Sequence, residues 1–242
     1  MLQKLRTWFS NRPSAAIRVL AFTASRHRPL MLRHCIMQLQ RQSYPVDHAI
    51  YVNSSDDEGP DCTTVHYNTL LDDLRNDASA KILIGYGKSK TYHENYVSAL
   101  QMTNVDDYDL FLKIDDDDIY LRSYVKDIVD DFAVNRWDYS GTCSQGLLNG
   151  RRWYPQLVRD HLGLTQEDRD LGIQGIMPPS AAFSRKAIRV ILDAPGSHII
   201  EDQYWRRILA QTPSLVPALR ADKNFIYHVH GGNLSTAEWL QP

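Results

Sequence analysis

Four consecutive aspartates, Asp115 to Asp118, are the residues of this sequence best suited to chemistry. They follow directly on the largely apolar run 109–114, which has the composition of a buried strand. Ionised carboxylates packed this closely repel one another, so a partly buried site needs a cation to hold them. Hard oxygen ligands favour Mg²⁺ or Mn²⁺, which fill their remaining positions with water and phosphate oxygens. The pattern predicts a divalent metal with a phosphate-bearing ligand, and the alternative is a solvated acidic turn.

The spacing within this run suggests a division of roles. Asp115 and Asp117 stand two residues apart, so in extended backbone their side chains point to the same side and can share one metal-bound ligand. The run also allows a register shifted by one, in which Asp116 and Asp118 are the equivalent pair.

The elements that must position these carboxylates alternate along the chain between short β-rich runs and amphipathic helices. The strand-like runs are 17–22, 49–52, 81–84, 109–114, 180–184 and 225–229. The helical runs are 29–39, 92–102, 121–134, 185–192 and 201–210. This order predicts a single-domain α/β fold with a mostly parallel sheet flanked by helices. Ligands of such sheets bind at the carboxyl edge of the strands, where the aspartates lie.

Composition excludes several classes of protein. The net charge of −2 and the absence of a long Lys/Arg block argue against a nucleic-acid partner. The sequence has no apolar stretch of about 18 residues and no cleavable leader pattern, so we expect a cytoplasmic protein. Cys35, Cys62 and Cys143 are far apart, which predicts free thiols.

The N-terminus differs in charge from the rest of the chain. Residues 1–34 contain Lys and Arg but no Asp or Glu, and segment 1–9 places apolar residues at roughly helical spacing beside Lys4 and Arg6. Such a helix suits an anionic membrane surface, which would place the protein at the inner face of the membrane. The alternative is a terminal helix packed on its own domain.

A strand that ends in Asp-x-Asp at mid-chain resembles the signature of GT-A glycosyltransferases, and residues 17–235 resemble their family 2-like members. The resemblance implies a nucleotide-sugar donor, with Asp115 and Asp116 toward the nucleotide sugar and Asp117 on a metal bound to the diphosphate. It also implies Mn²⁺ or Mg²⁺ as cofactor.

Further nucleotide contacts follow from the same resemblance. Asn53 stands where the family usually has an aspartate that binds uracil, so this chain departs from the pattern there. The residues carried over to the donor site are Thr23, Ser25, Arg26, Asn53, Asp56, Lys88 and Asn95.

The second half supplies the remaining candidates. Glu201 and Asp202 resemble the acidic pair that opens a helix near the acceptor site, and we expect Asp202 to be the catalytic base, with helix capping as the alternative. His230, with His228 as second choice, resembles the late histidine that these enzymes supply to the metal.

Together these features predict a metal-dependent, inverting transfer from a UDP-sugar to a glycan or lipid-linked glycan in bacterial surface-polysaccharide assembly. We divide the chain into the N-terminal segment 1–16 and a domain 17–242, with a nucleotide half to about 120 and an acceptor half from 121. The irregular stretches 141–154 and 163–179 are expected to be loops that carry acceptor specificity, with Arg151, Trp153 and Tyr154 as candidates.

Two alternatives remain from the sequence. A sugar nucleotidyltransferase shares the strand-then-acid pattern, but it normally has a glycine-rich basic loop after the first strand, and residues 23–29 contain no glycine. A non-catalytic carbohydrate-binding module would need no nucleotide site.

Overall fold

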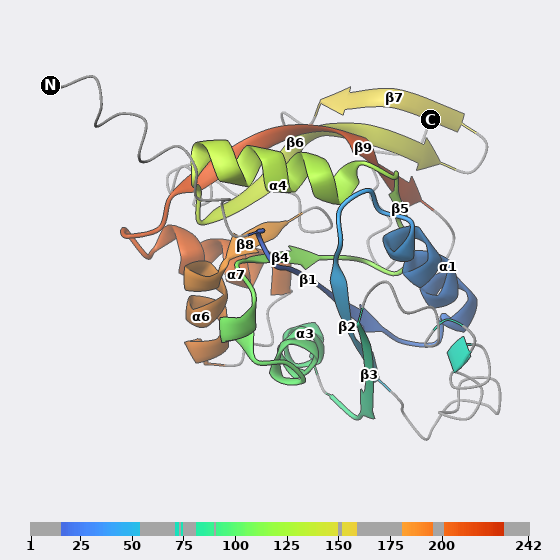
Figure 1. Cartoon of the computed structure of the whole chain (residues 1–242), viewed down its shortest axis with the longest axis horizontal. Coiled ribbons are helices and arrows are strands. Elements are labelled where there is room, and N and C mark those ends of the chain that lie inside the picture. Colours follow the sequence, from blue (N-terminus) through green and yellow to red (C-terminus); the bar gives the residue numbers. More distant parts are fainter. Residues whose placement is uncertain are drawn as a thin grey trace, which may run out of the picture.

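The computed structural model describes residues 16–53, 71, 72, 74, 81–89, 91–149, 152–158, 181–195 and 201–229. Within these residues, nine strands form one sheet in the order β3-β2-β1-β4-β8-β6-β9-β5, with β7 paired to β6 (Figure 1). The strands are β1 Val19–Ser25, β2 Asp47–Asn53, β3 Ile82–Gly87, β4 Leu110–Lys113, β5 Ile119–Tyr120, β6 Tyr139–Asn149, β7 Arg152–Val158, β8 Ala182–Ser184 and β9 Pro217–Val229.

Five α-helices and one short 3₁₀ helix accompany these strands in the described part of the chain. They are α1 Pro29–Gln40, α3 Tyr92–Gln101, η2 Val105–Asp107, α4 Tyr124–Asn135, α6 Arg185–Asp193 and α7 Glu201–Ala210. Local signals explain where several begin. Pro29 occupies the first turn of α1, Thr91 and Glu94 form a capping box on α3, and the Ser184 hydroxyl accepts from Ala187 N at the start of α6.

The sheet has a parallel half and a mixed half. Strands β3, β2, β1 and β4 pair in parallel, so their carboxyl ends lie at one edge. From β8 onward the pairing is mostly antiparallel, except for β6 with β9. The predicted α/β fold is confirmed, and the parallel order holds throughout the half that carries the aspartates.

Alternation along β1 explains the two layers of core. Leu20 and Phe22 face a cluster that includes α3, α6 and α7, whereas Val19 and Ala21 face a cluster that includes α1 and α4. Figure 1 shows α3 and α4 on opposite sides of the sheet centre. Every residue of β1 and β4 is buried, as expected for central strands covered on both faces.

The expectation of irregular loops over 141–154 was wrong. Residues 141–149 belong to β6 and 152–154 to β7, and the two strands pair antiparallel from Ser144↔Val158 to Asn149↔Arg152. The sequence held a hairpin signal at Asn149-Gly150, but glycines and polar residues over the whole stretch hid the alternation. Trp153 and Tyr154 lie on β7, while Arg151 and 163–179 lie outside the described residues.

Two further expectations can be compared with the structure. Cys35 is a buried free thiol, as predicted, while Cys62 and the side chain of Cys143 lie outside the described residues. None of the described helices is long and apolar enough to cross a bilayer. Residues 1–15, which include the basic N-terminal segment, are outside the described residues.

Candidate functional site

The four aspartates Asp115 to Asp118, called here the acidic run, follow β4 at the carboxyl edge of the parallel half. β4 lies between β1 and β8, so the run lies near the loop that leaves β1 after Ser25. Each carboxylate has a different environment.

Asp115 is held by three groups. Its carboxylate accepts from Lys113 Nζ at 2.8 Å and from the Tyr96 hydroxyl at 2.7 Å, and its backbone N donates to the Tyr120 hydroxyl at 2.8 Å. Burial by itself would raise the pKa of Asp115, but the Lys113 ammonium and these hydrogen bonds lower it below its ordinary value. Asp115 is therefore a fixed, ionised carboxylate.

Asp116 is buried beneath the β1 loop. Its carboxylate accepts from the Ser25 hydroxyl at 2.6 Å and lies 3.3 Å from Arg28 Nη2. Burial raises the pKa of Asp116 to about 7, even though Arg28 opposes the shift. This carboxyl group therefore titrates near neutral pH.

Asp117 has the second contact with Arg28. Its Oδ2 forms an ion pair with Arg28 Nη1, so one guanidinium spans two adjacent carboxylates. The two nitrogens approach different aspartates, and the arginine side chain is 23% exposed. This geometry makes Arg28 the main cation on the solvent side of the acidic run among the described residues.

Asp118 turns toward β9. Its Oδ1 accepts from the backbone N of His228 at 2.9 Å, and His228 Nδ1 lies 3.1 Å from the carbonyl oxygen of Asp117. Its Oδ2 is buried and has no hydrogen-bond partner among the described residues. Burial, together with the charges of Asp115 and Asp117, raises the pKa of Asp118 well above its ordinary value.

These environments fit a divalent cation. Lys113 pairs with Asp115, and Arg28 pairs with Asp116 and Asp117, so two cationic side chains face four acidic groups within the described residues, a formal excess of negative charge. Asp118 Oδ2 has no hydrogen-bond partner among the described residues, and burial is the main cause of the raised pKa of Asp116, so a bound cation would stabilise the ionised form of both carboxylates. No cluster of three or more His, Cys, Asp or Glu arranged as metal ligands occurs among the described residues.

The late histidines have different outcomes. His228 lies against Asp117 and Asp118, although its Nδ1 is directed to a backbone carbonyl. His230 lies outside the described residues. Ligation of a metal by either one stays a prediction.

The predicted nucleotide residues fall into two groups. Ser25 belongs to the acidic run's hydrogen-bond network, as described above. Thr23 is fully buried and hydrogen bonds His48 Nε2 at 2.8 Å, and Arg26 is exposed with Nε donating to His27. A nucleotide contact for Thr23 or Arg26 stays a prediction.

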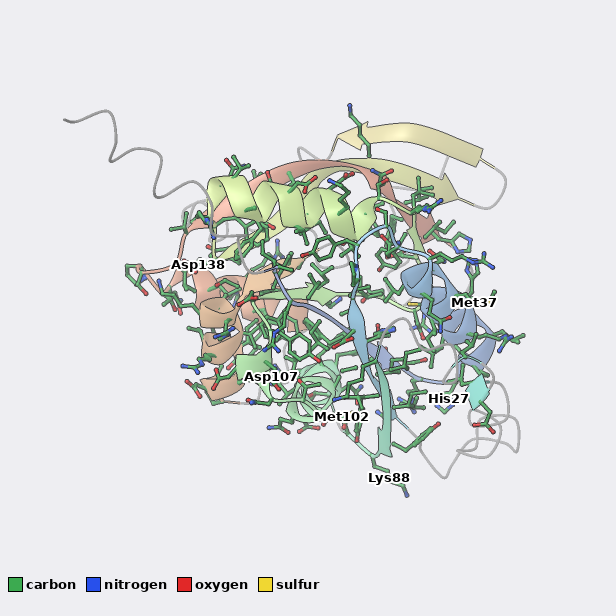
Figure 2. All side chains as sticks on the ribbon, viewed as in Figure 1. His27, Met37, Lys88, Met102, Asp107 and Asp138 are labelled. Carbon is green, nitrogen blue, oxygen red and sulfur yellow. The ribbon has the colours of Figure 1, made fainter. Side chains whose placement is uncertain are left out.

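The remaining nucleotide residues lie around the ends of β2 and β3. The Asn53 amide group donates to the carbonyl of Ser89 and accepts from its backbone N, which ties the two strand ends together. Lys88 is exposed and projects outward beyond β3 (Figure 2). Asn95 is buried on α3, with an Oδ1 that has no hydrogen-bond partner in the described part of the chain. Asp56 lies outside the described residues.

The predicted base lies on an element anchored to the acidic run. α7 begins at Glu201, as predicted, and the side chains of 201–203 are outside the described set. One turn later, Trp205 packs edge-on against Tyr96 with ring centroids 5.6 Å apart. Since Tyr96 also binds Asp115, the start of α7 is tied to the acidic run through one aromatic contact.

Sequence reasoning missed three residues whose side chains bind carboxylates of the acidic run: Arg28, Tyr96 and Lys113. Lys113 could have been found, because a lysine within a buried strand two residues before a carboxylate needs a charged partner. Arg28 follows the first strand, at an edge where ligands bind, but an arginine in a basic segment carries no signal of its own. Tyr96 stands on a helix face, where packing alone would explain it.

Comparison with known proteins supports the fold. No family model and no curated protein sequence matches the chain. Among solved structures, TarS of S. aureus (residues 1–349) in complex with UDP-GlcNAc is 14% identical with a TM-score of 0.65, and the match covers 90% of this chain and 60% of that one. The same protein with UDP is 15% identical with a TM-score of 0.63, covering 88% and 61%.

A second protein gives a similar match. The mannosyltransferase PcManGT from Pyrobaculum calidifontis, in complex with GDP-Man and Mn²⁺, is 11% identical with a TM-score of 0.62, and the match covers 96% of this chain and 64% of that one. The chain thus spans about three fifths of the length of these structures. At such identities the similarity shows the fold, and the described residues adopt the GT-A fold predicted from the sequence.

Proposed function

We propose that this chain is a glycosyltransferase that moves a sugar from a nucleotide-diphosphate donor, a UDP-sugar in our first choice, to a hydroxyl of a glycan or lipid-linked glycan. The observation that carries the proposal is the acidic run at the carboxyl edge of a GT-A sheet, with Arg28 beside it. Structures of this fold are recorded with UDP-GlcNAc and with GDP-Man and Mn²⁺, which favours the same class of donor here.

The donor would lie across the acidic run. Asp117 and Asp118 Oδ2 are the oxygens that would hold Mn²⁺ or Mg²⁺, while Asp115 is retained by Lys113 and Tyr96. When bound, such a cation offsets the charge that develops on the departing diphosphate. The protein would position this cation, because the carboxylates of the acidic run are held in place by the hydrogen bonds and ion pairs described above.

The reaction needs one proton acceptor. The acceptor hydroxyl oxygen attacks the anomeric carbon, and the bond from that carbon to the diphosphate oxygen breaks with its electron pair on the nucleoside diphosphate. The carboxylate of Asp202 takes the hydroxyl proton as the new bond forms. Attack from the face opposite the leaving group gives inversion at the anomeric carbon. Glu201 precedes Asp202 at the N-terminus of α7, where the helix dipole favours negative charge, and it assists Asp202 from there.

The cellular setting is part of the proposal. A basic N-terminal segment suits peripheral contact with an anionic membrane surface, where lipid-linked acceptors of surface-polysaccharide assembly are found.

The deciding experiment is calorimetric titration of UDP and of GDP into the protein, with and without Mn²⁺. We expect Mn²⁺-dependent binding of one nucleotide, lost in Asp117→Ala and kept in Asp130→Ala, which removes an exposed carboxylate paired with Lys126 on α4. Absence of binding to either nucleotide with Mn²⁺ or Mg²⁺ would contradict the proposal. In a turnover assay, Asp202→Asn should abolish transfer while nucleotide binding remains.

A further inference from the structure

Arg28 occupies the place where a cation would be expected. Its guanidinium lies between Asp116 and Asp117 and contacts both, while the side chain keeps 23% of its surface exposed. Burial would lower the pKa of Arg28, but the charges of Asp116, Asp117 and Asp115 raise it above its ordinary value. The arginine therefore remains charged and acts as counter-ion to the acidic run.

The position of Arg28 in the chain allows it to move without disturbing the core. It is the N-cap residue of α1, and its side chain makes no capping hydrogen bond. Its carbonyl oxygen accepts from Leu32 N, so the helix is held by the backbone and not by the guanidinium. A change in the side-chain torsions alone can take the guanidinium away from the carboxylates.

The preceding residue is held in an uncommon conformation. His27 has φ 56°, in the left-handed region that is uncommon for residues other than glycine, and it accepts a hydrogen bond from Arg26 Nε. Strained backbone of this kind persists where surrounding contacts enforce it, and it occurs often at ligand-binding loops. The loop thus presents Arg28 to the acidic run in a defined place.

Arg28 and a divalent cation compete for the same oxygen atoms. Asp117 Oδ2 is committed to Arg28 Nη1 in this structure, and a metal at that oxygen would bring a second positive charge within a few ångströms of the guanidinium. A metal at Asp117 Oδ2 would displace Arg28 Nη1, and a metal at Oδ1 would place two positive charges on one carboxylate, so each cation weakens the binding of the other. An arginine expelled from the carboxylates needs another anion, and the diphosphate of a donor beside the run is the nearest one that the proposed function supplies.

We propose that Arg28 is an exchangeable counter-ion of the donor site. When no donor is present, Arg28 neutralises Asp116 and Asp117. When a divalent cation binds Asp117, the Arg28 side chain moves and its guanidinium binds the donor's diphosphate. The inference rests on the proposed function for the diphosphate, whereas the competition for Asp117 concerns the metal alone. Removal of the Arg28 charge should therefore strengthen the binding of Mn²⁺ and weaken the binding of the nucleotide.

The test titrates Mn²⁺ alone, and then UDP or GDP at saturating Mn²⁺, into wild type, Arg28→Met and Arg28→Lys. Methionine keeps the unbranched stem and removes the charge. We expect Mn²⁺ alone to bind about tenfold tighter to Arg28→Met, a typical coupling between competing sites. The nucleotide should then bind about tenfold or more weakly, because a charge-assisted contact to the diphosphate is lost.

Two further variants complete the design. Arg28→Lys should stay close to wild type for Mn²⁺ and lose part of the nucleotide affinity, since lysine keeps the charge but not the two-pronged contact. Arg41→Met, at the opposite end of α1 and exposed, is the matched control and should change neither affinity. Near-ultraviolet circular dichroism of each variant reports on the fold.

The outcomes separate the two proposals. Unchanged or weaker Mn²⁺ binding by folded Arg28→Met would overturn the competition, and unchanged nucleotide binding would overturn the transfer to diphosphate. Absence of any nucleotide binding by wild type would overturn the proposed function and the transfer with it, and the Mn²⁺ titration would still decide the competition.

Discussion

Tyr96 donates a hydrogen bond of 2.7 Å from its hydroxyl to Asp115 Oδ1. The tyrosine lies on α3, and its ring packs edge-on against Phe22 of β1 and Trp205 of α7. One side chain therefore connects the acidic run to the aromatic core and to the helix that carries the predicted base. The position of Asp115 thus depends on α3, through Tyr96, and on the packing of Tyr96 against α7.

Replacement of Tyr96 by phenylalanine tests this connection. The ring packing remains and only the hydroxyl is lost, so we expect a loss of about 1 kcal/mol in the free energy of unfolding, measured in urea. Nucleotide affinity in the presence of Mn²⁺ should fall several-fold, because Asp115 loses one of the groups that orient it. Tyr108→Phe is the matched control, since the Tyr108 hydroxyl donates to Asp47 at 2.8 Å on a different strand. Equal loss of nucleotide affinity in both variants would show that Tyr96 has no special connection to the site.

Lys113 provides a second test, of the charge beneath the acidic run. Its side chain is 2% exposed, and its ammonium lies 2.8 Å from Asp115 Oδ1 and 4.7 Å from the centre of the Tyr96 ring. Lys113→Met leaves Asp115 without its cation, and we expect a loss of about 3 kcal/mol in unfolding free energy.

The control for Lys113 is a pair at the surface. Lys126 and Asp130 form an exposed ion pair on α4, so Lys126→Met should leave the unfolding free energy close to that of wild type. The double variant Lys113→Met/Asp115→Asn should recover part of the loss, because the uncompensated charge is gone. A double variant no more stable than Lys113→Met would argue that packing, and not charge, is what Lys113 supplies.

The central strands and most helices could be predicted because their signals are local. Apolar runs fixed β1 and β4, and Pro29 marked the start of α1 where the structure has it. The β6–β7 pair was missed because its glycines and polar residues break the alternation by which a half-buried strand is recognised.

The acidic run could be predicted from the sequence, but the residues that contact it from other elements could not. Adjacent carboxylates after a buried strand indicate a cation from charge alone, which is why the acidic run could be found. Arg28 and Tyr96 reach that run from residues 87 and 19 positions before Asp115, and such meetings are decided by tertiary packing. The sequence offered no local reason to select them.

Asp116 predicts how cation binding depends on pH. In the cation-free protein its pKa is raised to about 7 by burial, so below pH 7 the carboxyl is mostly protonated. Binding of Mn²⁺ favours the ionised form, and affinity should therefore increase as pH rises from 6 to 8. Titration at pH 7 in buffers of different ionisation enthalpy should reveal proton release. Asp116→Asn should lessen this release and leave the proton of Asp118, whose pKa is also raised by burial, and a wild type that releases no proton would contradict the assignment.

His48 predicts a loss of folding stability at acid pH. It is fully buried beside Thr23, and burial lowers its pKa from 6.5 to about 3. Above pH 6.5 the histidine is neutral in both folded and unfolded chains. As pH falls below 6.5 only the unfolded chain gains the proton, so His48 removes stability, by about 2 kcal/mol at pH 5.

Asp116 titrates in the same range and must be separated from His48. Its raised pKa means that the folded chain binds the proton first, which adds stability as pH falls from about 7 toward 3.8. A wild-type profile alone is therefore a sum of opposing contributions, and the test is a difference between variants. Thr23→Val/His48→Leu replaces the buried hydrogen-bonded pair by apolar side chains of similar size, so no polar partner is left unsatisfied. Relative to wild type, this variant should gain about 2 kcal/mol between pH 7.5 and pH 5 in urea unfolding, because only the wild type loses the His48 contribution. A constant difference across that range would mean that His48 is protonated in the folded protein at pH 5, and that its burial does not hold it neutral.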